Sequence, residues 1–515
     1  MLGRVAERTD PWDVLIVGGG ATGMGIAVDA ASRGYHTLLL EQSDFGKGTS
    51  SRSTKLIHGG VRYLQQGNVS LVLEALKERG LLRHNAPHLV HDLRFVVPNY
   101  DWWEAPFYGI GMKVYDVLAG KYGFGRSRVL SREKTLEFIP TLKTDGLRGG
   151  VQYFDGQFDD SRLLISLART AARQGATLLN YTRVVAMLHD SAGLVAGVSA
   201  VDQETGTELD LTARVVINAT GPFTDSVRHL DDPGAPTMIA PSQGVHLVLE
   251  SSFLAGDSAI MVPHTRDGRV MFAIPWHGHT LVGTTDTPLD RVELDPVPGE
   301  EEIDFILETA SDYLQRPPGR EDILSAFAGI RPLVREAGAD STAELSRDHT
   351  IHVANSGLVT VCGGKWTTYR NMAEETTTLA ATVADLEERP CITADLLIHG
   401  YHQHADQFGP LEVYGADAPA LLDLMRDQPG LDRQLHPDLP YRAAEVVWGA
   451  RYEMARTVDD ALSRRTRALL LNARAAVTMA PAVASLLAAE LGRDTTWATA
   501  QVAAFTDLAR SYIVD

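Results

Sequence analysis

Three glycines, Gly18, Gly20 and Gly23, form the pattern G-x-G-x-x-G between an apolar run and a stretch of small residues. Glycines at this spacing let the backbone approach a pyrophosphate, and a helix that begins there offers N–H groups and partial positive charge. Glu41 follows about 20 residues later, where an acid accepts hydrogen bonds from ribose hydroxyls and disfavours a 2′-phosphate. The four residues predict a dinucleotide site. The alternatives are a turn that only packs a helix on a strand, and a solvated glutamate at a strand end.

The elements expected around this turn are a strand over residues 13–17, a helix over 21–33 and a second strand over 35–40. Small residues on one face indicate the helix, and short apolar runs indicate the strands. A strand, a helix and a strand this close together form a βαβ unit with a parallel sheet and a right-handed crossover. The fold class is therefore α/β at this end of the chain.

Glycine-rich, hydroxyl-bearing and cationic motifs recur further along the chain. They are GTSSRSTKLIHGGVRYL (48–64), VVINATGP (215–222), GTTDTP (283–288), GIRPL (329–333) and CGGKWTTYR (362–370). Together with the glycine turn, this set resembles the aerobic-type, FAD-dependent glycerol-3-phosphate dehydrogenases, within the D-amino-acid-oxidase-like superfamily. The segment VVWGARYEMARTVDDALSRRT (446–466) is also similar to that family, so the resemblance covers nearly the whole chain.

The resemblance implies three parts: a glutathione-reductase-like FAD domain of Rossmann type, an antiparallel-sheet substrate domain and a helical C-terminal cap, together α+β. We expect the FAD domain over 1–92, 150–235 and 325–388, the substrate domain over 93–149 and 236–324, and the cap over 389–515. The residues agree with this division, because aromatic side chains crowd together between 92 and 150 and short strands follow between 246 and 284. Alanine-rich segments predict helices over 443–453, 459–472 and 497–512.

The same resemblance implies FAD as the cofactor, held without a covalent bond. Besides the glycine turn and Glu41, the expected contacts are Thr49, Ser50, Ser51, Ser53, Thr54, Lys55, Ala219, Gly221, Gly363, Gly364, Lys365, Thr367 and Thr368. The last five lie where a strand turns into a helix, so aligned peptide dipoles can stabilise negative charge on a reduced flavin. The alternatives are a surface Ser/Thr loop and a merely capped helix start. No metal ligand set is expected.

The resemblance further implies that glycerol 3-phosphate is oxidised to dihydroxyacetone phosphate by hydride transfer to FAD, and that a quinone or another acceptor takes the electrons. The expected substrate contacts are Arg62, Tyr63, His246, Thr285, Arg331 and Lys365. Arg331 and His58 are the expected catalytic residues: a guanidinium donates to two phosphate oxygens at once, and the pKa of an imidazole suits a general base. A loop arginine, and structural roles for His58 and His246, are the alternatives.

The composition excludes several classes of protein. The 515 residues exceed one domain, and 44% hydrophobic with 22% charged residues is typical of a folded chain. The net charge of -19 opposes binding to nucleic acid and to anionic lipid, so an anion site must be local. The two cysteines, Cys362 and Cys391, are too few for a disulfide framework or a four-thiolate metal site, and they suit a reducing compartment.

The start of the chain and its longest apolar run predict the cellular compartment of the protein. Charged residues precede the first apolar run, unlike a signal peptide, and the apolar run over 475–489 contains Pro481 and is shorter than the roughly 20 residues that span a bilayer. We therefore expect a cytoplasmic enzyme without a transmembrane helix. Any membrane contact is expected to be peripheral, on the inner face of the cell membrane, and a homodimer is left open.

Three other functions suit the same motifs. An oxygen-using glycerophosphate oxidase is the nearest, and an FAD-dependent amine or amino-acid oxidase is the next. The third is a non-catalytic FAD-fold protein that binds a protein partner, since a fold alone does not prove chemistry. Cations suited to phosphate disfavour the amine oxidases, and the oxidase-type insertion in the substrate domain is not seen between 283 and 329.

Overall fold

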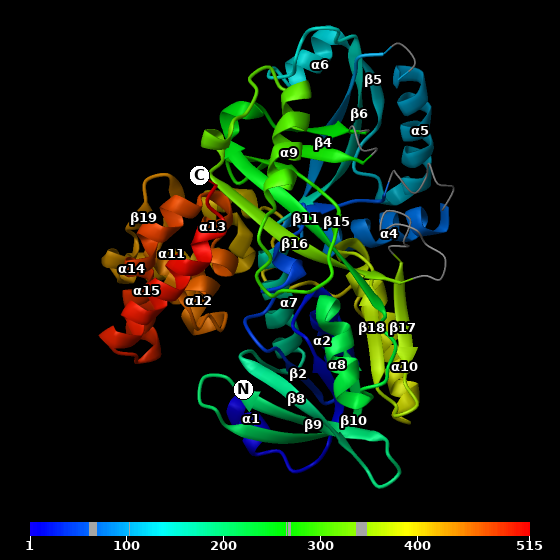
Figure 1. Ribbon diagram of the computed structural model, residues 1–515, viewed down its shortest axis with the longest axis vertical. Helices are drawn as coiled ribbons and strands as arrows, with labels where there is room; N and C mark the ends of the chain where they lie inside the picture. The colour runs from blue at the N-terminus through cyan, green and yellow to red at the C-terminus, as the bar shows by residue number, and fades with distance from the viewer. Residues whose placement is uncertain (61–68, 102–103, 264, 266–268, 336–347, 515) are drawn as a thin grey trace.

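The computed structural model of the chain describes residues 1–60, 69–101, 104–263, 265, 269–335 and 348–514. Two sheets and a helical C-terminal region make up this part of the chain (Figure 1). In Figure 1 the first sheet lies in the lower half with the N-terminus, and the second sheet lies above it. The C-terminal helices, in orange and red, lie beside the junction of the two sheets. The expected combination of α/β and antiparallel parts with a helical C-terminal region is confirmed.

The first sheet is built around β1 (Trp12–Val17), the apolar run before the glycine turn. Its order is β17-β18-β10-β1-β2-β7, and β1 is parallel to β2 and β10. The other strands are β2 (Thr37–Leu40), β7 (Thr177–Leu179), β10 (Glu208–Asn218), β17 (His349–Val353) and β18 (Val359–Gly363), and β8 (Thr182–His189) with β9 (Val195–Asp202) extends β10 antiparallel. Because both faces of β1 and β2 are buried, these two strands are almost continuously apolar.

Helices cover one face of the first sheet. Helix α2 (Ala21–Ser32) packs between α7 (Asp160–Arg173) and α10 (Tyr369–Val383) and shares a core with β1 and β10. The remaining helices near this sheet are α1 (Leu2–Ala6) and α8 (Thr224–Asp231). The predicted βαβ unit is confirmed, since β1, α2 and β2 begin and end within two residues of the expected ranges.

The second sheet has the order β15-β11-β14-β13-β12-β4-β6-β3, and β16 and β5 pair with β11 and β6. Its strands are β3 (Leu56–Ile57), β4 (Val90–Asn99), β5 (Arg128–Ser131), β6 (Gly149–Phe158), β11 (Ile239–Glu250), β12 (Ser258–Val262), β13 (Met271–Trp276), β14 (His279–Gly283), β15 (Thr287–Pro288) and β16 (Ser325–Val334). Its pairs are antiparallel except that of β4 with β12. Around it lie α4 (Val69–Asn85), α5 (Glu104–Ala119), α6 (Arg132–Phe138) and α9 (Glu300–Tyr313). The expected antiparallel sheet is therefore present.

Strand pairing bears on the expected domain boundaries. β6 pairs with β4, and β16 pairs with β11, so residues 150–158 and 325–334 belong to the second sheet by their hydrogen bonds. The expected FAD domain includes both segments. An apolar run indicates a strand but not the partner of that strand. The domain boundaries expected at 150 and 325 therefore rest on the positions of the motifs and not on strand pairing. The division into domains stays a prediction.

The C-terminal region is helical. Its elements are the 3₁₀ segment η7 (Ala405–Asp417), α11 (Ala418–Asp427), the small strands β19 (Gln434–His436) and β20 (Leu439–Arg442), α12 (Ala443–Tyr452), the π-helical turn η9 (Asp460–Arg465), α13 (Ala468–Leu471), α14 (Ala473–Leu491) and α15 (Thr495–Arg510). The helices predicted over 443–453 and 497–512 are confirmed. The single helix predicted over 459–472 is wrong, because the chain forms the π-turn and then the separate helix α13. The arginines of this segment are buried in ion pairs, which an amphipathic surface helix would not allow.

Helix α14 is longer than the apolar run indicated. It spans 19 residues and is the one helix in the described part of the chain whose length and composition would allow it to cross a membrane. One face of α14 is buried against α12, α13 and α15, and this face includes Met479, Val483 and Leu487. Pro481 lies inside the helix and does not end it. The packing identifies α14 as a core helix of the C-terminal region.

Candidate active site

A cavity of about 880 Å³ lies where the two sheets meet. Residues at the carboxyl ends of β1, β2, β10 and β18 line one part of it, and residues of β11 and β16 line another. In open α/β sheets, ligands bind beyond the carboxyl ends of parallel strands. A cavity of this size suits a cofactor together with a small substrate.

The glycine turn lies at one end of the cavity. Gly18 adopts a φ of +111°, and a Cβ there would lie 2.6 Å from the carbonyl oxygen of Ala219. Gly20 begins helix α2 and lines the cavity. Gly23 does not line the cavity; a Cβ on Gly23 would overlap the carbonyl oxygen of Gly18. The first two predicted glycines are therefore at the cavity wall, whereas the third allows the helix to pack on the turn.

Glu41 follows β2 and lines the same end of the cavity. Its carboxylate accepts hydrogen bonds from the backbone N–H of Gly19 at 2.7 Å and of Ser43 at 2.9 Å. Burial raises the pKa of the Glu41 carboxyl above its ordinary value, while the two N–H groups oppose that rise. Glu41 thus stabilises the glycine turn and also faces the cavity, where the sequence places a ribose.

The hydroxyl-rich loop, residues 48–55, has two faces. Thr49, Ser50, Ser53 and Thr54 line the cavity. Ser51 and Lys55 do not: the Lys55 ammonium is fully buried and donates to Asp160 at 2.7 Å and to the carbonyl oxygen of Ser51 at 2.8 Å. Desolvation lowers the pKa of Lys55 to about 7. The loop therefore offers hydroxyls to the cavity and its lysine to the protein interior.

The hydroxyl of Ser50 fixes the loop against the glycine turn. The backbone N–H of Ala21, the first residue of α2, donates to Ser50 Oγ at 2.9 Å, and Trp366 Nε1 donates to the Ser50 carbonyl oxygen at 3.0 Å. Trp366 also lines the cavity. Sequence reasoning did not select this tryptophan, although it stands between two selected residues of the motif CGGKWTTYR.

The ends of β10 and β18 provide the remaining predicted cofactor contacts. Ala219, Gly221, Gly363, Gly364, Lys365 and Thr367 line the cavity, whereas Thr368 is buried behind it. Gly363 and Gly364 adopt φ angles of +79° and +74°, which a residue with a Cβ rarely adopts. The chain turns there from β18 into α10 and brings its backbone to the cavity wall.

His58, His246, Thr285 and Arg331, which are predicted for catalysis or substrate, line the cavity together. Arg62 and Tyr63 lie outside the described residues. Among the described cavity residues that sequence reasoning did not select are Arg52, Asp155, Arg269, Thr284 and Trp366. Arg52, Thr284 and Trp366 stand inside quoted motifs, whereas no motif includes Asp155 or Arg269.

Arg331, on β16, is held in one orientation by β11 and by the residues that follow β14. Its guanidinium donates to the carbonyl oxygens of Gln243 at 3.2 Å and Thr285 at 2.9 Å and to the hydroxyl of Thr284 at 3.1 Å, and lies 3.4 Å from Asp286 Oδ1. The side chain is 21% exposed. A guanidinium fixed in this way keeps a charged, partly open edge toward the cavity, as anion binding requires.

His246 is more deeply buried than the other predicted histidine. Its Nε2 lies 2.9 Å from Thr54 Oγ1, its ring stacks on Phe327, and its Nδ1 has no hydrogen-bond partner among the described residues. Desolvation, followed by the charges of Lys55 and Arg331, lowers the pKa of His246 well below its ordinary value. The imidazole is therefore neutral at physiological pH.

His58 precedes two glycines at the wall of the cavity and is only half-buried. Its backbone N–H donates to Thr367 Oγ1 at 3.2 Å. The next backbone N–H, of Gly59, donates to Tyr115 Oη at 2.8 Å. These contacts fix the backbone around His58 while its side chain faces the cavity.

Thr285 has a structural role as well as a place at the cavity wall. Its hydroxyl accepts from the backbone N–H of Val245 at 3.0 Å and donates to Glu302 at 2.7 Å. Both hydrogen bonds lie inside the protein, so the hydroxyl is already engaged. The hydroxyl of the neighbouring Thr284 accepts from Arg331 at 3.1 Å and donates to the carbonyl oxygen of Thr285 at 3.3 Å.

The expected FAD fits the residues that are present. Gly18 has no room for a Cβ, the N-terminus of α2 opens on the cavity at Gly20 and Ala21, and Glu41 stands at the end of the next strand. A backbone cradle at a helix N-terminus is what a pyrophosphate requires. On the part of the wall that β11 and β16 form, Arg331 provides a cation suited to an anion.

Comparisons with known proteins agree with this arrangement. A family model described as FAD dependent oxidoreductase matches residues 13–370, and one described as C-terminal domain of alpha-glycerophosphate oxidase matches 359–498. The chain is 41% identical to the mitochondrial glycerol-3-phosphate dehydrogenase of Mesocricetus auratus, over 98% of this chain and 74% of that protein. It is also 41% identical to a mitochondrial glycerol-3-phosphate dehydrogenase of Arabidopsis thaliana, over 94% of this chain and 84% of that protein.

Solved structures show the same likeness. The glycerol-3-phosphate dehydrogenase of Bacillus halodurans, complexed with FAD, superimposes with a TM-score of 0.81 at 30% identity, covering 99% of this chain and 96% of that one. The L-alpha-glycerophosphate oxidase of Mycoplasma pneumoniae, with FAD bound, has a TM-score of 0.57 at 19% identity, over 75% of this chain and 98% of that one. The second likeness shows a shared fold alone.

Proposed function

The chain belongs to the family of FAD-dependent glycerol-3-phosphate dehydrogenases, and from this premise we propose that its cavity oxidises glycerol 3-phosphate to dihydroxyacetone phosphate. One observation carries the proposal: a single cavity has a glycine cradle suited to a pyrophosphate at one end and the fixed guanidinium of Arg331 at the other. FAD, when bound, supplies a ring that accepts a hydride from the substrate carbon.

The cofactor contacts that we propose are the residues on the cavity wall. Gly18, Gly20 and the N-terminus of α2 would hold the pyrophosphate, and Glu41 would accept hydrogen bonds from the ribose. The hydroxyls of Thr49, Ser50, Ser53 and Thr54 and the backbone at Gly363 and Gly364 would extend this contact along the cofactor. Gly23, Ser51, Lys55 and Thr368 support the wall from behind and are not proposed as direct contacts.

Arg331 binds the substrate phosphate in this proposal, with Lys365 on the same cavity wall. The chain carries a net charge of -19, so a dianionic substrate needs local cations to offset the surrounding field. The guanidinium of Arg331 is positioned before the substrate arrives, which lowers the entropic cost of binding.

His58 takes the proton from the C2 hydroxyl of the substrate in this proposal. The alternative base, His246, is almost fully buried, and its pKa lies well below the ordinary value, so it holds a proton weakly. A general base works best when its pKa is near the working pH. We therefore assign proton transfer to a ring nitrogen of His58, and assign to His246 a hydrogen bond that orients the substrate.

The activity is tested by mixing the FAD-loaded protein with glycerol 3-phosphate in the absence of oxygen. The flavin absorbance should bleach and dihydroxyacetone phosphate should form, while unphosphorylated glycerol should have little effect. Bleaching by an amine or an amino acid instead would contradict the proposal. Repeating the reaction in air separates the two glycerophosphate activities, since an oxidase would form peroxide at the rate of turnover and a dehydrogenase would require an added acceptor.

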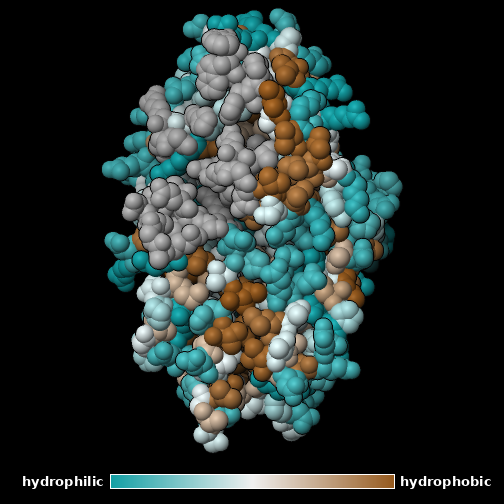
Figure 2. Space-filling view, turned by 90° about the vertical axis from the view of Figure 1, so that its right-hand side faces the viewer, coloured by the Kyte–Doolittle hydropathy of each residue, from teal (hydrophilic) through white to brown (hydrophobic). Residues whose placement is uncertain are grey.

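We also propose that electrons leave to a membrane quinone, with the protein attached peripherally to anionic lipid. The support is a local patch on α5 and β5, where Ile110, Val114, Val117 and Val129 are exposed. Three of them lie at helical spacing on α5, and Ile110 and Val117 are 69% and 79% exposed. Figure 2 shows apolar side chains gathered in the upper part of the face that carries α5.

Basic side chains flank this patch in spite of the acidic balance of the chain. Lys113, Lys121, Arg126 and Arg128 are exposed on the same segment. Apolar side chains that enter the lipid interface, ringed by cations that attract anionic headgroups, are typical of peripheral attachment. The opposite side of α5 is buried and includes Tyr115, so the patch is the outward face of a helix that packs near the active site.

Flotation with vesicles of anionic phospholipid tests this attachment. Val117→Asp should weaken binding several-fold, because it places a negative charge on the docking face. Val297→Asp, at a similarly exposed valine outside the patch, is the matched control and should bind as the wild type does. Equal binding of both variants would contradict the assignment. Binding that mild detergent does not release would also contradict it, because a peripheral protein should be released. A cytoplasmic location stays a prediction.

A further inference from the structure

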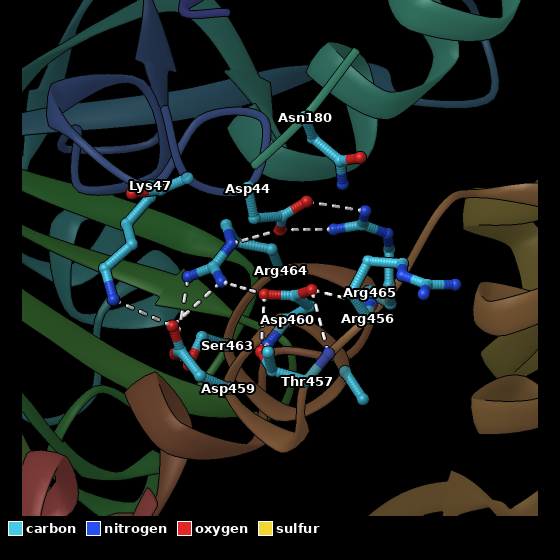
Figure 3. Close-up of polar contacts among 12 residues, drawn as sticks. Asp44, Lys47, Asn180, Arg456, Thr457, Asp459, Asp460, Ser463, Arg464 and Arg465 are labelled. Atoms are coloured by element: carbon cyan, nitrogen blue, oxygen red, sulfur yellow. Dashed lines mark hydrogen bonds and ion pairs between the residues drawn. The ribbon is translucent and has the colours of Figure 1, made fainter. Parts of the chain in front are cut away.

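The segment that contains the hydroxyl-rich loop also has a face that turns away from the cavity and contacts the C-terminal region. We define residues 44–55 as the cofactor loop. Asp44, at its start, is fully buried and accepts from Arg465 at 2.7 and 2.8 Å and from Arg464 Nε. Both arginines belong to the π-helical turn η9, and Figure 3 shows them reaching Asp44 from the C-terminal side.

Two more residues of the C-terminal region, Asp459 and Arg467, contact the same loop. Lys47, which lines the cavity, lies 3.2 Å from Asp459 Oδ2. The Arg467 guanidinium donates to the carbonyl oxygen of Ser51 at 2.8 Å and to Asp160 Oδ1 at 3.0 Å. The segment Asp459–Arg467 therefore contacts the loop directly at Asp44, Lys47 and Ser51.

Asp160 extends the contact of Arg467 to the far end of the loop. Its Oδ2 accepts from the backbone N–H of Ser53 at 3.1 Å, from Ser53 Oγ at 2.7 Å and from Lys55 Nζ at 2.7 Å. Ser53 is also on the cavity wall. Arg467 thus acts on a residue of the cavity wall through a single carboxylate.

The buried cluster is balanced in charge and in hydrogen bonds. Three carboxylates, Asp44, Asp459 and Asp460, face three cations, Lys47, Arg464 and Arg465 (Figure 3). Asp460 also accepts from the backbone N–H of Arg456 at 2.7 Å and of Thr457 at 3.0 Å. Buried ion pairs add little net stability, since desolvation offsets their attraction, but a fully paired cluster permits only one arrangement of its parts. This cluster is therefore suited to holding the cofactor loop and the C-terminal segment in one arrangement.

We propose that Asp44 and Arg467 are positioning residues of the flavin site, through which the segment Asp459–Arg467 fixes the cofactor loop in the conformation that binds FAD. The C-terminal region is then a supporting layer of the cofactor site as well as a cap. By linkage, FAD binding and the order of this segment strengthen each other. The inference uses the cofactor of the proposed function and does not depend on the substrate.

The FAD dissociation constant of the flavin-free protein tests the proposal. Asp44→Asn and Arg467→Met should raise it by about 10-fold or more, because the first leaves the buried Arg465 without its carboxylate and the second removes the hydrogen bonds to Ser51 and Asp160, so that each releases the loop. The matched control is Glu453→Gln. Glu453 accepts from Arg162 at 2.7 and 2.8 Å in an equally buried pair between α7 and the C-terminal region, and its side chain does not contact the cofactor loop. Its backbone carbonyl accepts from Arg465, a contact that the side-chain substitution leaves in place. The FAD dissociation constant of the Glu453→Gln variant should differ from that of the wild type by less than about threefold.

Hydrogen exchange of the wild type gives a second readout that needs no variant to fold. Amides of residues 456–467 should exchange more slowly with FAD than without it, since linkage acts in both directions. Equal FAD affinity in the wild type and Asp44→Asn, or exchange in 456–467 that FAD leaves unchanged, would overturn the inference alone. A wild-type chain that does not take up FAD would overturn the proposed function with it.

Discussion

The two ends of the cavity are built from different materials. The glycine-turn end consists of backbone and short hydroxyls at the ends of parallel strands, as at Gly18, Gly20 and Ser50. The opposite end consists of long side chains on antiparallel strands, as at His246 and Arg331. A backbone cradle has no spare volume, whereas a side chain can be shortened without moving the chain. Substitutions at the first end should therefore remove the cofactor, and substitutions at the second should slow a reaction that still has it.

The largest effect is expected at the glycine turn. Gly23→Val should yield protein without FAD, because a side chain there would overlap the carbonyl oxygen of Gly18 and force the turn to shift. The flavin-to-protein absorbance ratio after purification measures this loss. Gly111→Ala, where nothing lies within 4 Å of an added Cβ, is the control and should stay yellow. A yellow Gly23→Val protein with full FAD content would contradict the expected difference between the two ends of the cavity.

The next effect in size is expected at His58. His58→Asn should retain FAD but slow flavin reduction by glycerol 3-phosphate by about 10²- to 10⁴-fold, as loss of a general base typically does. Anaerobic stopped-flow absorbance across a range of pH measures the rate. His246→Asn should cost less, since the imidazole of His246 is buried and neutral. If the flavin of His58→Asn is reduced at the wild-type rate, another residue must accept the proton.

A smaller effect is expected at Arg331. Arg331→Ala should lower kcat/KM for glycerol 3-phosphate by roughly 10- to 150-fold, because a charged hydrogen bond contributes about 1.5–3 kcal/mol. Arg331→Lys should recover part of the loss, mainly in KM and less at high salt, since lysine keeps the charge but not the planar fork. Steady-state rates with unphosphorylated glycerol are the comparison. Equal losses for both substrates would mean that Arg331 does not bind the phosphate.

The smallest effect is expected behind the cavity wall, at Lys55 of the cofactor loop. Its pKa is about 7 in the folded chain and 10.5 in the ordinary state, so the unfolded chain binds more protons between these values. The free energy of unfolding should therefore rise with pH across that window, with a contribution of at most about 1.4 kcal/mol per pH unit. Denaturant unfolding of the wild type and Lys55→Met compares the slopes. Identical slopes would show that Lys55 does not titrate there.

The sequence predicts the glycine-turn end of the cavity better than the opposite end. G-x-G-x-x-G and Glu41 lie in one βαβ unit, so spacing along the chain already determines their contact. His246 and Arg331 come together only because β11 pairs with β16, a pairing that spacing does not reveal. Only the family resemblance placed these two residues in one site.

The directions of side chains were less predictable than their positions. Ser51 and Lys55 lie in a motif whose other hydroxyls face the cavity, yet both face the interior because Asp160 and Arg467 bind them there. The helix predicted over 459–472 is interrupted for a related reason. Arg464 pairs with Asp44 across 420 positions of sequence, and no local pattern indicates a partner that distant.

A crystal structure of the FAD-loaded protein with glycerol 3-phosphate bound would test the central claim most directly, namely that one cavity holds the cofactor by backbone at one end and the substrate phosphate by Arg331 at the other. We expect the FAD pyrophosphate within hydrogen-bond distance of the N-terminus of α2, the substrate phosphate on Arg331 and the substrate C2 hydroxyl beside His58. A substrate phosphate bound elsewhere, with Arg331 still in contact with Gln243, Thr284, Thr285 and Asp286, would contradict the account.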